Sequence, residues 1–166
     1  MSECPMPDWL IKPPGRDFVV FTAAWLGAAY YLGHERGALV GNICWFGLAF
    51  LYFGLMSEKS VLWMVSREQR KNTELVDGLR KAMGFLGGMN AGMAVLSALF
   101  LTALGDGSTG LFQQANERRV LFIGFAVGHL SQALFQRFNP PGILWYIYWI
   151  DLAMAAANGY CGWAAQ

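Results

Sequence analysis

Five long apolar runs constrain the fold of this chain more than any other feature of its sequence. They cover residues 17–33, 38–56, 81–104, 120–135 and 143–163. A helix needs about 20 mostly apolar residues to cross a bilayer, and the third and fifth runs meet that length most easily. Charged residues form only 14% of the chain, too few to give a small domain a water-soluble surface. The sequence therefore predicts an all-α, polytopic membrane bundle of five transmembrane helices, the alternative being four spans with one amphipathic helix on the surface.

Polar segments divide the chain around these runs. Residues 1–16 form an N-terminal segment that we expect in the cytoplasm, and residues 17–166 are expected to form one transmembrane domain. Only residues 34–37 separate the first two runs, which predicts a tight helical hairpin. Residues 57–80 mix charged with apolar side chains, as an amphipathic connection on the membrane surface does. Residues 139–142, Asn-Pro-Pro-Gly, predict a firm turn before the last helix.

The basic residues predict an orientation, because they concentrate on the cytoplasmic side of membrane proteins. With five spans, the side of the N-terminus carries Lys12, Arg16, Lys59, Arg67, Arg70, Lys71, Arg80, Lys81 and Arg137. The other side carries Arg36, Arg118 and Arg119. We therefore expect the N-terminus in the cytoplasm and the C-terminus on the opposite side, in a bacterial inner membrane or an organelle membrane.

Glycines recur at four-residue spacing in two of the runs. They are Gly84, Gly88 and Gly92 in the third run and Gly124 and Gly128 in the fourth. Small residues at this spacing let two helices approach closely in lipid. The pattern predicts helix packing at these positions, either within this bundle or in a homodimer.

Ionisable residues within membrane spans are costly and usually face the bundle interior or a cavity. His129 and Asp151 are such residues, and each lies about 12 Å from the same end of its helix at the α-helical rise. Asn90 falls close to that level, and Gln132 and Asn158 share helix faces with His129 and Asp151. Three interpretations stay open: hydrogen bonding between helices, a pocket for a lipid-, sterol- or quinone-like molecule, or acid–base chemistry by His129 and Asp151.

Motifs for other chemistry are missing from the sequence. It contains no HExxH, GxSxG, P-loop or dinucleotide fingerprint, so we assign no catalytic residue. Its three cysteines are far apart and form no CxxC, so we assign no metal site. We predict no cofactor, although a bound lipid or quinone is compatible with the polar residues. A net charge of +1 argues against nucleic acid as a partner.

Residues 79–160 share a layout with a known group of membrane proteins. A basic residue opens a Gly-rich helix, a short loop carries basic residues, and a Gly-containing helix with a polar residue precedes a Gly/Pro turn. The positions are Arg80, Gly84, Gly88, Arg118, Gly128, His129 and Gly142. This layout resembles the DoxX-like small membrane proteins, which are related in layout to the scaffold proteins of sterol C-4 demethylation. The resemblance implies a small bundle that supports partner proteins in a membrane complex.

These observations lead to one expectation about function. We expect a non-catalytic accessory or scaffolding subunit of a larger membrane protein complex, in contact with membrane lipids and other membrane subunits. Arg67, Arg70 and Lys71 in the connection are the expected docking residues for a partner or for anionic headgroups. The alternatives are a protein that binds a small molecule at Asn90, His129, Gln132, Asp151 and Asn158, or a small membrane enzyme that uses His129 and Asp151.

Overall fold

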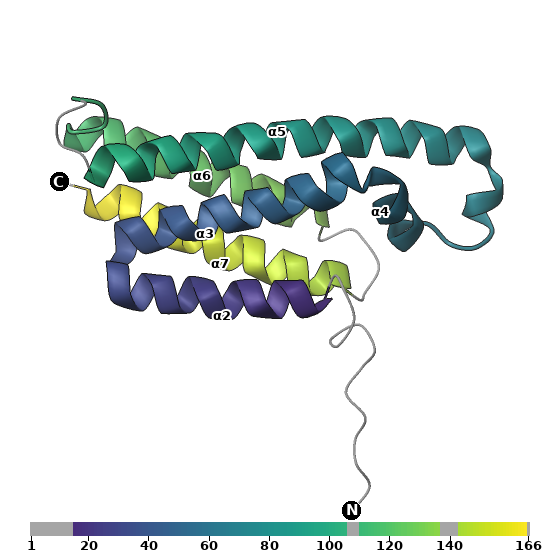
Figure 1. The fold of residues 1–166 in the computed structure, drawn as a ribbon, viewed down its shortest axis with the longest axis horizontal. Coiled ribbons are helices and arrows are strands. Elements are labelled where there is room, and N and C mark those ends of the chain that lie inside the picture. The colour runs from purple at the N-terminus through teal and green to yellow at the C-terminus, as the bar shows by residue number, and fades with distance from the viewer. Residues whose placement is uncertain (1–14, 106–109, 137–142, 166) are drawn as a thin grey trace, which may run out of the picture. The chain divides into compact units, whose positions relative to one another are not determined.

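The computed structural model describes residues 15–105, 110–136 and 143–165, and these residues are almost entirely helical (Figure 1). The helices are α2 (Gly15–Leu32), α3 (His34–Ala49), the π-helical η1 (Phe50–Leu55), α4 (Ser57–Met64), the 3-10 turn η2 (Gln69–Lys71), α5 (Thr73–Gly105), α6 (Ala115–Gln136) and α7 (Ile143–Ala164). No strand occurs in the described ranges. The all-α prediction is confirmed.

Two helical segments are long and apolar enough to cross a membrane. One is the 22-residue segment His34–Leu55, made of α3 and η1, and the other is the 33-residue helix α5. A shorter apolar stretch, Val19–Leu32, lies in α2. The prediction of five spans stays a prediction. The expected cytoplasmic N-terminal segment up to residue 14 and the expected turn at 139–142 lie outside the described residues.

The chain divides into two compact units. The first unit combines Met1–Gly41 with Phe100–Gln166, and the second unit is Asn42–Leu99. Helices α3 and α5 each contribute residues to both units. The expectation that residues 17–166 form one transmembrane domain stays a prediction.

A tight hairpin joins α2 to α3 in the first unit. The chain reverses at Gly33, whose φ of +81° suits glycine because it has no Cβ. The backbone N–H of Gly37 donates to the carbonyl of Gly33 at 2.8 Å, so residues 34–37 form the first turn of α3 and the link is shorter than expected. A Cβ on Gly37 would overlap the Ala29 backbone, which shows how closely the two helices approach.

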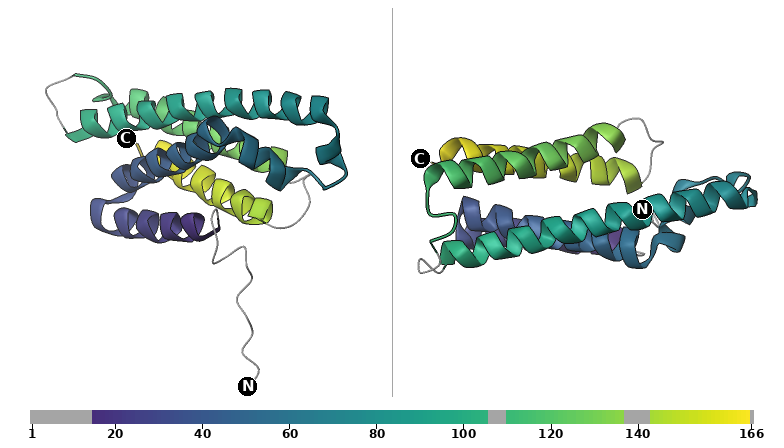
Figure 2. Two further views of the ribbon diagram at one scale, coloured as in Figure 1. Left: turned by 45° about the vertical axis from the view of Figure 1, so that its right-hand side comes forward. Right: turned by 90° about the horizontal axis from the view of Figure 1, so that it is seen from above.

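Aromatic and sulfur-containing side chains fill the core of the first unit. Phe21 stacks on Trp25, with their ring centroids 6.3 Å apart. A Cβ on Gly41 would meet the Trp25 indole and the methyl of Met154, so glycine makes room there for α2 and α7 to pack on α3. Helices α6 and α7 lie side by side (Figure 2). This pairing brings their polar residues together.

Helices η1 and α5 run past each other in the second unit, where the chain reverses after α4 (Figure 1). Their closest approach is between Gly54 and Gly87, since a Cβ on Gly87 would overlap the Gly54 backbone. The expected packing glycines of α5 lie elsewhere on the helix. Within the second unit, no atom lies within 4 Å of a Cβ built on Gly84, Gly88 or Gly92.

Within this unit no helix packs at these three glycines. The expected helix packing at them, within the bundle or in a homodimer, stays a prediction. A helix turns by about 100° per residue, so Gly87 faces a different direction from Gly88. Gly124 on α6 likewise has nothing within 4 Å of a Cβ. A role for these open glycines in a dimer stays a prediction.

The expected amphipathic connection, residues 57–80, is divided into several short elements. Ser60 in α4 donates to the Tyr52 carbonyl at 2.6 Å, which holds α4 against the π-helical turn. Helix α5 begins at Thr73, capped by Asn72, whose Oδ1 accepts from the Leu75 N–H at 3.0 Å. Residues 73–80 are thus the first turns of α5, a longer helix than the apolar run alone predicted.

Candidate functional site

A buried histidine–aspartate pair joins α6 to α7. His129 Nδ1 lies 3.1 Å from Asp151 Oδ1, within hydrogen-bonding distance. Both side chains are 0% exposed. The depth argument from the sequence placed these residues at the same level, and the expected contact is present.

Two other polar residues of the predicted site each donate to a carbonyl of their own helix. Asn158, fully buried on α7, donates to the Met154 carbonyl at 2.8 Å. Asn90 on α5 donates in the same way to the Leu86 carbonyl at 2.8 Å. Such bonds to the carbonyl four residues earlier satisfy an amide donor without a partner helix.

Two predicted ligand-binding residues, Asn90 and Gln132, make no hydrogen bond with the His129–Asp151 pair. Asn90 belongs to the second unit, whereas the pair belongs to the first. Gln132 lies three residues after His129 on α6 and is half-buried, with no hydrogen bond to the described residues. The ligand-binding role of the five-residue set stays a hypothesis.

The pair can orient an imidazole and hold a proton between two helices. Asp151 accepts at Nδ1 when that nitrogen carries the proton, which fixes the tautomer of His129. Acid–base catalysis also requires that a substrate reach the free nitrogen. With both side chains fully enclosed, the present conformation offers no open surface at either group.

Three buried side-chain atoms have no hydrogen-bond partner among the described residues. They are Asn90 Oδ1, Trp25 Nε1 and Arg118 Nε. Trp25 was not predicted as a polar site, because its apolar run shows only an aromatic residue in a membrane span. Among the described residues, no group of three or more His, Cys, Asp or Glu side chains could hold a metal ion.

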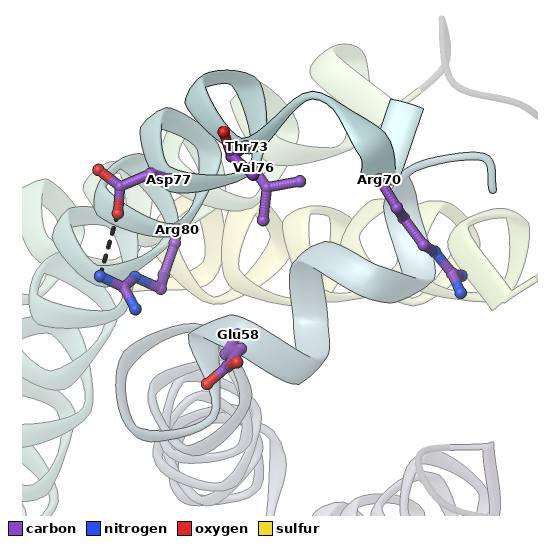
Figure 3. Close-up of a pocket in the computed structure, with 6 residues that line it drawn as sticks. All are labelled: Glu58, Arg70, Thr73, Val76, Asp77 and Arg80. Atoms are coloured by element: carbon purple, nitrogen blue, oxygen red, sulfur yellow. Dashed lines mark hydrogen bonds and ion pairs between the residues drawn. The ribbon is translucent and has the colours of Figure 1, made fainter. Parts of the chain in front are cut away.

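A second candidate site lies where α4 and the start of α5 diverge (Figure 3). We call it the α4–α5 pocket. Its volume is about 190 Å³, and it is lined by Glu58, Arg70, Thr73, Val76, Asp77 and Arg80. Of these residues only Arg70 was a predicted docking residue. The others were missed because their meeting depends on the reversal after α4.

Ion pairs at the start of α5 define one end of this pocket. Asp77 Oδ1 accepts from Arg80 Nη2 at 3.0 Å, and Asp77 Oδ2 lies 2.8 Å from Lys81 Nζ. The hydrogen bond and charge of Lys81, followed by the charge of Arg80, hold the pKa of Asp77 below its ordinary value. Asp77 precedes the apolar part of α5 and is ionised at neutral pH.

The three predicted docking residues have different surroundings. Arg70 donates to the Leu62 carbonyl and lines the α4–α5 pocket. Lys71 pairs with Glu68, with its Nζ 3.1 Å from Oε1. Arg67 is exposed and makes no ion pair with the described residues. Of the three, Arg70 alone lines the α4–α5 pocket.

No family model, curated protein or solved structure matches this chain. The resemblance to the DoxX-like proteins accordingly stays a prediction from the sequence.

Proposed function

We propose that this chain is a non-catalytic accessory or scaffolding subunit of a larger membrane protein complex, with its N-terminus on the cytoplasmic side. The observation that carries the proposal is the exposure of large apolar side chains together with the burial of polar ones. Large apolar side chains are exposed, among them Phe85 at 73%, Trp163 at 71% and Val120 at 70%. Polar side chains are enclosed, including His129 and Asp151 at 0%. A surface of this kind suits lipid and neighbouring helices better than water.

The enclosed polar residues favour a structural role over catalysis. Asn90, Ser97 and Asn158 each donate to the carbonyl four residues earlier on the same helix. The His129–Asp151 pair bonds between α6 and α7 without exposure. The first kind of bond satisfies a donor within its own helix, and the second kind links two helices of a bundle in lipid.

An open row of small residues supports association with another helix. Gly84, Gly88 and Gly92 follow one another at four-residue spacing along α5, and nothing in the second unit covers them. Phe85 and Met89, exposed at 73% and 58%, flank this row. A partner helix could approach the α5 backbone closely there.

Gentle extraction tests this proposal. The full chain is taken from its native membrane in a polymer disc, and the intact mass and the ultraviolet–visible spectrum are recorded on one sample. A stoichiometric partner without a chromophore is the expected result. Gly88→Leu should reduce recovery of that partner, whereas the matched change Gly78→Leu, at another open glycine of α5, should not. A lone protomer would contradict the proposal.

A second candidate function is supported by the 3.1 Å contact between His129 and Asp151. A buried acid–base pair of this kind could bind a lipid- or quinone-like molecule or transfer a proton when the bundle opens. His129→Ala and Asp151→Asn would then abolish ligand retention or turnover. An accessory subunit carrying either change should still capture its partner, so partner recovery separates the two functions.

A further inference from the structure

The α4–α5 pocket originates in a bend of the chain after η1. On the side of the apolar segments, Gly54 and Gly87 bring η1 and α5 into backbone contact. The π-helical turn then ends at Met56, whose φ of −115° and ψ of 30° depart from helical values. Helix α4 then leaves α5, and the space between them opens. The pocket therefore lies just beyond the apolar parts of both segments, at the level where phospholipid headgroups would lie if they cross a bilayer.

Two opposite charges in the pocket are left without a charged partner. Arg80 is paired with Asp77 at 3.0 Å. Arg70 bonds only the Leu62 carbonyl, which leaves most of its five donors available. The exposed carboxylate of Glu58 makes no ion pair or hydrogen bond with the described residues. In Figure 3, Arg70 lies at the opposite end of the pocket from the Asp77–Arg80 pair, and Glu58 lies across from both on α4.

The start of α5 adds a hydroxyl to the lining of the pocket. Thr73 is the first residue of α5, a 33-residue helix, and its hydroxyl makes no hydrogen bond with the described residues. Arg70 thus contributes a guanidinium and Thr73 a hydroxyl to the lining of the pocket.

We infer that the α4–α5 pocket binds the phosphoethanolamine headgroup of a membrane phospholipid. The phosphate lies at Arg70 and Thr73, and the primary ammonium lies at Glu58. This inference rests on the proposed membrane location of the chain. A guanidinium recognises phosphate by charge-assisted hydrogen bonds, and a carboxylate accepts from an ammonium in the same way.

The charges of the pocket discriminate between headgroups. An anionic headgroup without an ammonium would give the Glu58 carboxylate no cation to pair with. Its negative charge would also be repelled by the Asp77 carboxylate, which lines the same pocket. The quaternary ammonium of a choline headgroup has no N–H to donate, and its usual site is an aromatic cage. None of the described lining residues is aromatic. A primary ammonium is the cation that Glu58 suits best.

A lipid-retention experiment tests this assignment. The full chain is reconstituted in nanodiscs of phosphatidylcholine with equal amounts of phosphatidylethanolamine and phosphatidylglycerol. It is then released in mild detergent, and retained lipid is counted by native mass spectrometry. The wild type should retain phosphatidylethanolamine about tenfold over phosphatidylglycerol, since one charge-assisted hydrogen bond accounts for that ratio. Glu58→Gln should bring the ratio to about one, and Arg70→Gln should reduce retention of both lipids.

Matched variants and soluble probes complete the test. Glu74→Gln and Lys59→Gln remove exposed charges of the same segment that do not line the pocket, and both should leave the ratio unchanged. Free phosphoethanolamine should displace the retained lipid, whereas phosphocholine should not. An unchanged ratio in Glu58→Gln overturns the assignment even if Arg70→Gln fails to fold, because the Glu58 carboxylate bonds no described residue. A chain that does not stay in the nanodisc overturns the proposed function instead.

Discussion

Breaking the His129–Asp151 pair should reveal a coupling between α6 and α7. The two atoms are 3.1 Å apart and both side chains are 0% exposed, so neither group can turn to solvent when its partner is lost. An unsatisfied buried polar group costs about 1–3 kcal/mol. Interhelical hydrogen bonds in membrane proteins average about 0.6 kcal/mol and reach about 1.7 kcal/mol. We expect each change to leucine to destabilise the fold by about 2 kcal/mol, with a coupling of about 1–1.5 kcal/mol.

A double-mutant cycle measures this coupling. His129→Leu, Asp151→Leu and the double variant are unfolded by a denaturing detergent in mild micelles, with tryptophan fluorescence as the signal. The double variant should be more stable than the sum of the single changes predicts, because the loss of the shared hydrogen bond is counted once instead of twice. Gln132→Leu combined with Asp151→Leu is the matched control and should be additive, since Gln132 makes no hydrogen bond with the described residues. A His129–Asp151 coupling below about 0.5 kcal/mol would refute the reasoning.

Two further predictions concern the second unit. Gly87→Val should destabilise the chain by about 1–3 kcal/mol because its Cβ would overlap the Gly54 backbone, while Gly88→Val should change stability by less than about 0.5 kcal/mol. The reverse ranking in the same unfolding assay would be evidence against the Gly54–Gly87 contact. Lys81→Met should raise the pKa of Asp77 in a carboxyl NMR titration, because Lys81 is the main cause that lowers it. The pKa of Asp77 is lower in the folded chain than its ordinary value of 3.8. Its carboxylate therefore stabilises the fold at pH values above 3.8, and this contribution is lost as the pH falls through the folded pKa. An unchanged Asp77 pKa would show that the ion pair is weak in solution.

Hydropathy predicted the bounds of most helices closely. It did not predict the polar turns that lengthen some helices beyond their apolar runs. The expected run 143–163 matches α7 (Ile143–Ala164) to within one residue. Helix α5 begins at Thr73 instead of 81, because its first turns are charged and a charged helical turn carries no apolar signal. The π-helical turn η1 has no marker in the sequence that we recognised. The bend after η1 decides where α4 goes, so the α4–α5 pocket could not be predicted either.

Side-chain depth was more predictable than helix rotation. Rise per residue depends only on position along the chain, and it correctly placed His129 level with Asp151. Which face of α5 meets a neighbour depends on packing across the whole unit. The glycine spacing of Gly84 and Gly88 therefore indicated a small-residue row but not its partner, and Gly87 makes the contact instead.

Membrane topology is the most direct test of the account. Arg67→Cys before α5 and Asn116→Cys after it are introduced separately into a chain whose three native cysteines are changed to alanine. An impermeant maleimide is applied to right-side-out and inverted vesicles. The account predicts that the residue 67 variant is labelled only from the cytoplasmic side and the residue 116 variant only from the opposite side. Labelling of both variants from one side, or recovery of the chain outside the membrane fraction, would contradict it.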